Sequence, residues 1–223
     1  MSSKNIYPNY IDALIELLKT LNIKNKKIGY DIDDAMIEKK ISESLNTTLI
    51  YNTELFYYPR LVKTDFEVQQ LTKSARCNEL SIYETVEKLY LGISEDEIVN
   101  IFNFNVAKNG GIPEIKMIKI GRNAVFGQCL PKKENKLQYG DILWFDSDAR
   151  YQGYWSDIAR IYIIGENNRA SELYSCLREG MICAKQNIEI SMSGKDVFNL
   201  TMDQIILIKM ALKIIEGTIL VMG

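Results

Sequence analysis

The chain has 223 residues and a mass of 25.6 kDa, with 27 basic and 29 acidic side chains and a formal charge of −2. It contains no histidine, which excludes Ser-His-Asp and Cys-His relays and histidine-based zinc sites. The near-neutral charge, an isoelectric point near 5.4 and the lack of a concentrated basic patch in the sequence argue against nucleic acid as a partner.

The first residues have no apolar core of signal-peptide length, and no uncharged run of the sequence is long enough to span a bilayer. We therefore expect a cytoplasmic protein with no membrane partner. Free thiols are expected for the four cysteines, which lack a C-x-x-C spacing: Cys77, Cys129, Cys176 and Cys183.

Residues 1–60 alternate helical and strand-like patterns, which predicts a partial α/β domain with a small core. Residues 57–60 are interpreted as a linker, because Pro59 restricts its neighbour and ends regular structure. The expected elements are a helix over 10–21, a strand over 27–31, a helix over 33–45 and a strand over 48–51.

Residues 61–204 are predicted to form the main domain. Ser94 and Glu97 have the spacing of a capping box, which predicts a helix from there through Phe102. Two β-rich runs flank a polar turn that contains glycine, which indicates a hairpin over 141–165. The other expected elements are a helix over 65–92, a loop over 109–113, strand structure from Ile115, a helix over 168–187 and another that begins near Ser193.

Asp146 and Asp157 lie eleven residues apart within the predicted hairpin. If the hairpin turns between Tyr151 and Gln152, the two side chains face each other across the ladder. Carboxylates this close repel each other unless a cation or a proton lies between them, and hard divalent cations prefer oxygen ligands. The alternative from spacing alone is that both are ordinary turn or surface residues.

Side chains alternate between the two faces of a strand, which predicts the residues that lie beside this pair. Asp148 shares the face of Asp146 and is interpreted as a turn residue, whereas Arg160 lies on the opposite face and is interpreted as a structural ion-pair partner. An apolar wall is expected beside the carboxylates, made by Ile142 and Trp144 on one strand and by Ala159, Ile161 and Ile163 on the other.

The order of these residues resembles a known family. Gly140-Asp141, Asp146, Gly153-Tyr154, Ser156-Asp157 and Arg160 are similar to the GD…D…GY.SD..R signature of the pita-bread metallopeptidases, which include prolidase, Xaa-Pro aminopeptidase and methionine aminopeptidase. Upstream, residues 60–67 resemble the R.VK...E start of the catalytic domain in the Xaa-Pro branch. The resemblance covers residues 60–204, and residues 1–55 resemble the end of that branch's N-terminal domain.

The resemblance implies an α+β fold, namely the first half of a pita-bread catalytic domain preceded by part of an α/β N-terminal domain. It also implies that Asp146 and Asp157 are the first two ligands of a dinuclear site. In the complete family, that site holds two divalent metal ions (Mn or Co) with Asp, Asp, His, Glu and Glu, and acts on a peptide substrate. The implied activity is that of a Xaa-Pro aminopeptidase or dipeptidase.

The sequence departs from the family pattern near this site. Gln128 stands where the family usually has a substrate-side histidine, and Asp148 stands where a glycine is usual. No counterpart of the ligand His and the two Glu aligns with the chain, so we expect weak metal binding and no activity from it. The alternative is a non-catalytic binding module of the same fold, and a homodimer is among the open oligomeric states.

Residues 205–223 form an apolar tail where the family has a histidine-rich GHG segment. Codons chosen for Met210 to Gly223 spell GIKNYRRHHTGHG when they are read from the third base. In the shifted frame, the visible residue fixes the last two bases of each codon, and only the first base can be chosen. A histidine-rich motif is therefore hard to obtain by choice of codons alone. We therefore hypothesise that the tail is a frameshifted translation of the histidine segment. The alternative is a genuine terminal helix with an apolar face that includes Ile205, Leu212 and Ile219.

Overall fold

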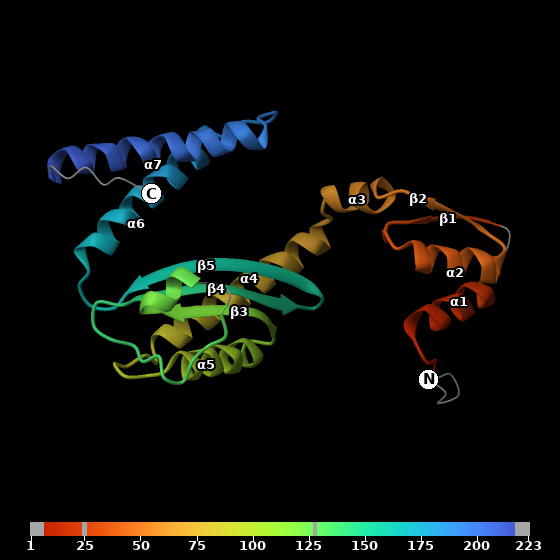
Figure 1. Cartoon of the computed structure of the whole chain (residues 1–223), viewed down its shortest axis with the longest axis horizontal. Helices are drawn as coiled ribbons and strands as arrows, with labels where there is room; N and C mark the ends of the chain where they lie inside the picture. The colour runs from red at the N-terminus through yellow and green to blue at the C-terminus, as the bar shows by residue number, and fades with distance from the viewer. Residues whose placement is uncertain (1–6, 24–25, 127–128, 217–223) are drawn as a thin grey trace. The chain divides into compact units, whose positions relative to one another are not determined.

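The computed structural model of the chain describes residues 7–23, 26–126 and 129–216, without the side chains of 125–126 and 207–216. The chain divides into two compact units, Met1–Val68 and Gln69–Gly223. Figure 1 follows the chain through both units by colour.

The N-terminal unit contains the predicted alternation of helices and strands, and this prediction is confirmed. Its strands pair in parallel, so the chain between them crosses over as a helix. The side chains of Asn9 and Asp34 cap the two helices that precede the strands by accepting hydrogen bonds from first-turn N–H groups. The elements are α1 (Tyr10–Thr20), β1 (Lys27–Tyr30), α2 (Ala35–Leu45), β2 (Thr48–Tyr51) and α3 (Glu54–Leu61).

Helix α3 replaces the predicted linker over residues 57–60, so the prediction of irregular structure there was wrong. The side chain of Asn52 accepts hydrogen bonds from the N–H groups of Glu54 and Leu55, at 3.0 and 3.3 Å, and so starts the helix. Pro59 lies inside this short helix, which ends two residues later at Leu61. A local cap therefore outweighed the helix-breaking tendency of proline.

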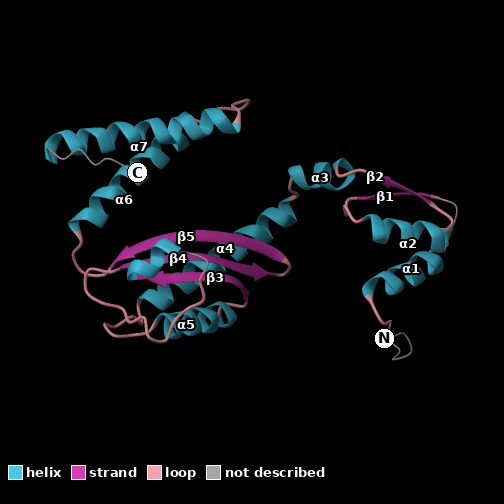
Figure 2. Ribbon diagram, viewed as in Figure 1, coloured by secondary structure: helices cyan, strands magenta, loops and turns pink. Residues whose placement is uncertain are grey.

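The second unit is built on an antiparallel sheet of three strands in the order β3-β4-β5. Figure 2 shows the three strands side by side with α4 and α5 along them. The elements after α3 are α4 (Asp65–Val86), α5 (Glu95–Lys108), β3 (Ile112–Ile120), the 3-10 helix η1 (Gly121–Phe126), β4 (Ile142–Tyr151), β5 (Tyr154–Ile163), α6 (Asn168–Asn187) and α7 (Gly194–Glu216).

Several predicted boundaries differ from those observed. Helix α4 ends at Val86, six residues early, whereas α5 starts at the predicted Ser94 capping box and continues to Lys108. Strand β3 begins at Ile112, inside the predicted loop, with Pro113 near its start. Because β3 is an edge strand, a proline near its end costs little ladder pairing. Helix α7 continues through the apolar tail to Glu216.

The main core lies between α4, α5 and one face of the sheet. Phe102 and Val106 of α5 are fully buried, as are Leu143 and Phe145 of β4. The rings of Phe102 and Phe145 lie 6.2 Å apart. Alternate residues of β4 are buried, so the residues between them, including Asp146 and Asp148, lie on the opposite face. The core thus fixes which way the carboxylates point.

Candidate metal centre

The candidate site lies on the hairpin formed by β4 and β5. Its two-residue turn is Gln152-Gly153, with φ values of 50° and 89°. Positive φ at both central residues is typical of a type I′ turn, the turn that best matches the twist of a hairpin. Tyr151 and Tyr154 consequently form the last pair of the ladder.

This turn lies one residue further along the chain than predicted, so the cross-strand partner of each residue shifts by two. Asp157 lies directly opposite Asp148, and Asp146 lies opposite Ala159. The predicted direct opposition of Asp146 and Asp157 is therefore wrong, although both stay on one face as diagonal neighbours. The interpretation of Asp148 as a turn residue is also wrong. The predicted turn would have required a positive φ at Tyr151. In the observed turn, Gly153 has the positive φ instead, which glycine adopts without steric cost.

Three carboxylates therefore share one face of the hairpin. Asp146 and Asp148 are half-buried, while Asp157 is exposed. Burial raises the pKa of Asp146, and repulsion by Asp157 raises it further. Burial also raises the pKa of Asp148, with additional repulsion from Asp157, Asp146 and Glu114. Burial is the larger cause of both shifts, and the neighbouring carboxylates add to it; a proton or a cation at this face would relieve their repulsion.

The expected apolar wall is present in the ladder. Ile142 pairs with Ile163 and Trp144 pairs with Ile161 on the same face as Asp146. Ile161 and Trp155 are 39% and 49% exposed. An apolar flank lowers the local dielectric constant and so strengthens attraction between the carboxylates and a cation.

Helix α4 holds the strands from the buried face through polar contacts. Asn78 Nδ2 donates to the carbonyl oxygen of Ser147 at 2.6 Å, and Ser147 Oγ donates to Asn78 Oδ1 at 2.9 Å. Ser74 Oγ donates to the carbonyl oxygen of Ala149 at 3.0 Å, and Ser156 Oγ lies 3.1 Å from the same oxygen. All four side chains that make these contacts are buried, so β4 is pinned at residues adjacent to Asp146 and Asp148.

This contact surface was not predicted from the sequence, because apolar spacing does not mark it; Phe66, an apolar residue of α4, is 61% exposed. A signal was present, since small polar residues recur at helical spacing along α4. The buried members of this polar stripe are Gln70, Ser74, Asn78, Ser81 and Thr85.

Two arginines near the site are held by ion pairs. Arg160 lies 3.4 Å from Glu79 Oε1 on α4, which confirms its interpretation as an ion-pair partner. Arg150 Nε donates to Glu114 Oε1 at 2.6 Å. Glu114 lies where the pairing of β3 with β4 shifts by one residue, between Pro113 and Lys116. This irregularity places a third strand's carboxylate near Asp148.

A second buried contact fixes the segment that follows β3. Glu95, fully buried at the start of α5, accepts hydrogen bonds from the N–H groups of Ile120 and Lys132, each at 3.1 Å. Its carboxylate also lies 3.7 Å from the buried Lys119 Nζ. The predicted substrate-side residue, Gln128, lies outside the described residues.

The carboxylates of this face match in part the ligands that the divalent ions implied by the motif prefer. Carboxylate oxygens suit Mn²⁺, and their mutual repulsion would be relieved by a cation. Among the described residues, however, no three histidine, cysteine, aspartate or glutamate side chains come together as a metal-binding group. Asp146 and Asp157 thus fit as part of a ligand set, and their assignment as ligands stays a prediction.

The chain matches a family of peptidases. The model of metallopeptidase family M24 matches residues 69–218. An uncharacterized peptidase of Methanocaldococcus jannaschii is 26% identical over 145 residues, which cover 63% of this chain and 41% of the relative. An uncharacterized peptidase of Bacillus subtilis is 25% identical over 150 residues, which cover 66% of this chain and 42% of the relative.

Solved structures with a similar fold come from the Xaa-Pro peptidases. The X-Pro aminopeptidase of Thermotoga maritima has a TM-score of 0.76 and 21% identity, over 91% of this chain and 58% of its own. The prolidase of Pyrococcus furiosus has a TM-score of 0.76 and 19% identity, over 90% of this chain and 59% of its own. The predicted α+β, pita-bread fold is thereby confirmed for the part of these proteins that the chain spans. No helix in the described part of the chain is long and apolar enough to cross a bilayer.

Proposed function

Since the chain belongs to metallopeptidase family M24, we propose that Asp146 and Asp157 are two ligands of a dinuclear metal site for the hydrolysis of Xaa-Pro peptides. The observation that carries this proposal is their placement on one face of the β4–β5 hairpin, beside Trp144 and Ile161. When bound to such a site, divalent ions act as Lewis acids on the scissile carbonyl.

The chain's own residues have distinct parts in this proposal. Asp146 and Asp157 supply hard oxygen ligands, and Asp148 adds a third negative charge directly opposite Asp157. The contacts of Asn78 and Ser74 hold β4 in place below them. Apolar neighbours keep water away from one side of the carboxylates and so strengthen their field.

The 223 residues by themselves lack histidine, so the His ligand implied by the family resemblance has no candidate among them. We therefore propose that this chain alone binds Mn²⁺ or Co²⁺ weakly and does not hydrolyse peptides. Weak here means a dissociation constant of about 1 mM or more, equivalent to a binding free energy of roughly −4 kcal/mol. A cytoplasmic location and the oligomeric state stay predictions.

Isothermal calorimetry with MnCl₂, together with an assay of Ala-Pro hydrolysis, tests the proposal. We expect one weak binding event that D146N and D157N each abolish, and no hydrolysis. The matched control is E172Q, which removes an exposed carboxylate on α6 paired with Arg169 and should leave Mn²⁺ binding unchanged. Binding that survives both aspartate substitutions would refute the ligand assignment, and tight binding of two ions with hydrolysis would refute the proposed inactivity.

The domain boundaries and the origin of residues 205–223 are separate proposals. We propose domains over 1–60 and 61–204, followed by a tail translated out of frame. The nucleotide sequence tests the tail directly. In the shifted frame, the codons for Gly217 to Met222 should read CAC CAT and, later, CAT. Codons that cannot give this reading would contradict the frameshift.

A further inference from the structure

The N-terminal unit contains a cavity that the proposed peptidase site does not use. The cavity has a volume of about 310 Å³ and lies between α1, α2 and the two strands. Its wall is mainly apolar. Side chains that form this wall include Leu14, Leu18, Ile28, Ile41, Leu49 and Phe56.

The cavity opens to the surface, where Tyr10 and Ile32 of its wall are 68% and 52% exposed. A ligand can therefore reach it. Small-molecule sites are largely apolar hollows of roughly 300–1,000 Å³ with a few polar groups at defined places. In the described part of this unit, a two-stranded sheet covers the helices, and the buried apolar cluster has four members. The wall residues therefore have apolar surface available to a ligand.

The polar groups of the cavity carry negative charge. Among the described residues that line it, Asp31 and Glu38 are acidic and none is basic. The interaction of the Tyr30 hydroxyl with Glu38 raises the pKa of Tyr30 to about 12, with further contributions from burial and from the charges of Glu38 and Asp33. The negative charge around Tyr30 would therefore favour a cation at this end of the cavity.

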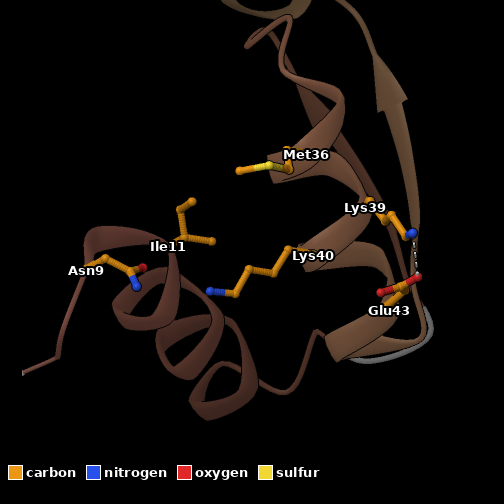
Figure 3. A pocket seen from close by; sticks show the side chains of 6 residues that line it. All are labelled: Asn9, Ile11, Met36, Lys39, Lys40 and Glu43. Carbon is orange, nitrogen blue, oxygen red and sulfur yellow. Dashed lines mark ion pairs between the residues drawn. The ribbon is translucent and has the colours of Figure 1, made fainter.

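The lysines of α2 do not neutralise this charge, because they are engaged elsewhere. Lys40 Nζ lies 2.6 Å from Asp12, and Lys39 Nζ lies 4.0 Å from Glu43. Figure 3 shows both lysines lining a different hollow, together with Asn9 and Ile11 at the start of α1. These two hollows therefore differ in charge: the described lining of the apolar cavity has two acids and no base, whereas the other hollow is lined by two lysines and one glutamate.

We propose that this cavity binds a small primary amine with an apolar tail. The tail occupies the space between Leu14, Ile41 and Leu49, and the ammonium group lies at Asp31 and Glu38. Burial of the tail supplies most of the affinity, because apolar burial is the larger favourable contribution. The carboxylates supply selectivity for a cation over a neutral or anionic molecule of the same shape. This site is independent of the proposed metal centre.

Methyl NMR of the full chain, titrated with 4-phenylbutylamine, tests the site. We expect saturable shifts of the Ile28, Ile41 and Leu49 methyl groups and no shift of Ile118 in the other unit. The control ligands are 4-phenylbutanol and 4-phenylbutyrate, which share the tail. An exposed ion pair typically changes affinity by about two- to five-fold, so the amine should bind that much more tightly than the alcohol, with the carboxylate weakest.

Two variants separate the charge from the shape of the cavity. E38Q should bring the affinities of the amine and the alcohol within about a factor of two, while E43Q, which lines the other hollow, should leave their ratio unchanged. Equal binding of amine and alcohol by the unsubstituted chain would overturn the proposal, as would shifts that do not saturate. A dimer in light scattering, with intermolecular NOEs to the cavity methyl groups, would show that a second copy fills the cavity and would also overturn it.

Discussion

The two units of the chain both combine helices with a small sheet, but their strands are held in different ways. In the second unit, thirteen buried apolar residues form one cluster, and polar side chains of α4 bind the backbone of β4. In the N-terminal unit, the corresponding buried cluster has four residues. The difference teaches that helix and strand patterns in a sequence do not indicate how firmly a strand is held in place. The number of side chains buried between the strands and the helices decides how stable that part of the fold is.

Removal of a central core ring should have the largest effect. F145A removes a fully buried side chain that contacts Phe102 and Tyr162, so we expect a loss of about 3–5 kcal/mol in the free energy of unfolding of the second unit. The partner variant I41A in the N-terminal unit should cost about 2–5 kcal/mol there and leave the second unit unchanged. Urea titration with hydrogen exchange resolved by unit measures both. Equal protection loss in both units after either substitution would show that they unfold as one.

Loss of the polar contact between α4 and β4 should have the next largest effect. N78A leaves the buried Ser147 hydroxyl and carbonyl without their observed partner, and we expect a cost of about 1–3 kcal/mol. A double-mutant cycle with S147A measures the coupling, because the two substitutions act on one contact. The surface variant N100A, which removes a longer contact with Asp96, is the control. Simple additivity of N78A and S147A would contradict the proposed role of this contact.

Neutralisation of one carboxylate should stabilise the second unit slightly. D148N keeps the shape of the side chain and removes a charge that lies opposite Asp157. We expect a gain of about 0.2–1 kcal/mol in the free energy of unfolding at pH 7 without metal, because like charges directly opposite in a ladder are destabilising. E172Q loses an exposed ion pair and should not stabilise. A lower stability of D148N than of the unsubstituted chain would show that Asp148 has a favourable partner.

The smallest expected effect is a difference in pH dependence between the units. Hydrogen bonds from the Ser94 hydroxyl and N–H, with the charge of Lys136, hold the pKa of Glu97 below its ordinary 4.5. A depressed folded pKa gives stability above pH 4.5 that is lost as pH falls through the folded value. Chemical denaturation of the second unit between pH 7 and 3 should therefore show a shallower acid loss for E97Q.

Asp12 provides the matched case in the N-terminal unit, where the hydrogen bond from Lys40 lowers its pKa below 3.8. D12N should flatten only the acid loss of that unit, in a lower pH window than E97Q. An effect of E97Q on the N-terminal unit would contradict the separation of the two.

Local signals in the sequence determined a large part of the fold. The alternation in residues 1–60, the Ser94 capping box and the hairpin each depend on a few neighbouring residues, and each is present. The spacing of Asp146 and Asp157 also placed both on one face, because side chains alternate strictly along a strand. The resemblance of these residues to a peptidase signature agrees with the family match.

Only the tertiary structure decided the register of the hairpin, the contacts of α4 and the cavity of the N-terminal unit. The turn at Gln152-Gly153 and the packing of β4 against α4 together placed Asp148 opposite Asp157, because moving the turn by one residue shifts every cross-strand partner by two. Polar residues of α4 became buried because backbone groups of β4, distant in the sequence, satisfied their hydrogen bonds. The sequence by itself thus determined the residue types and faces of the site, while long-range packing decided which of these residues meet.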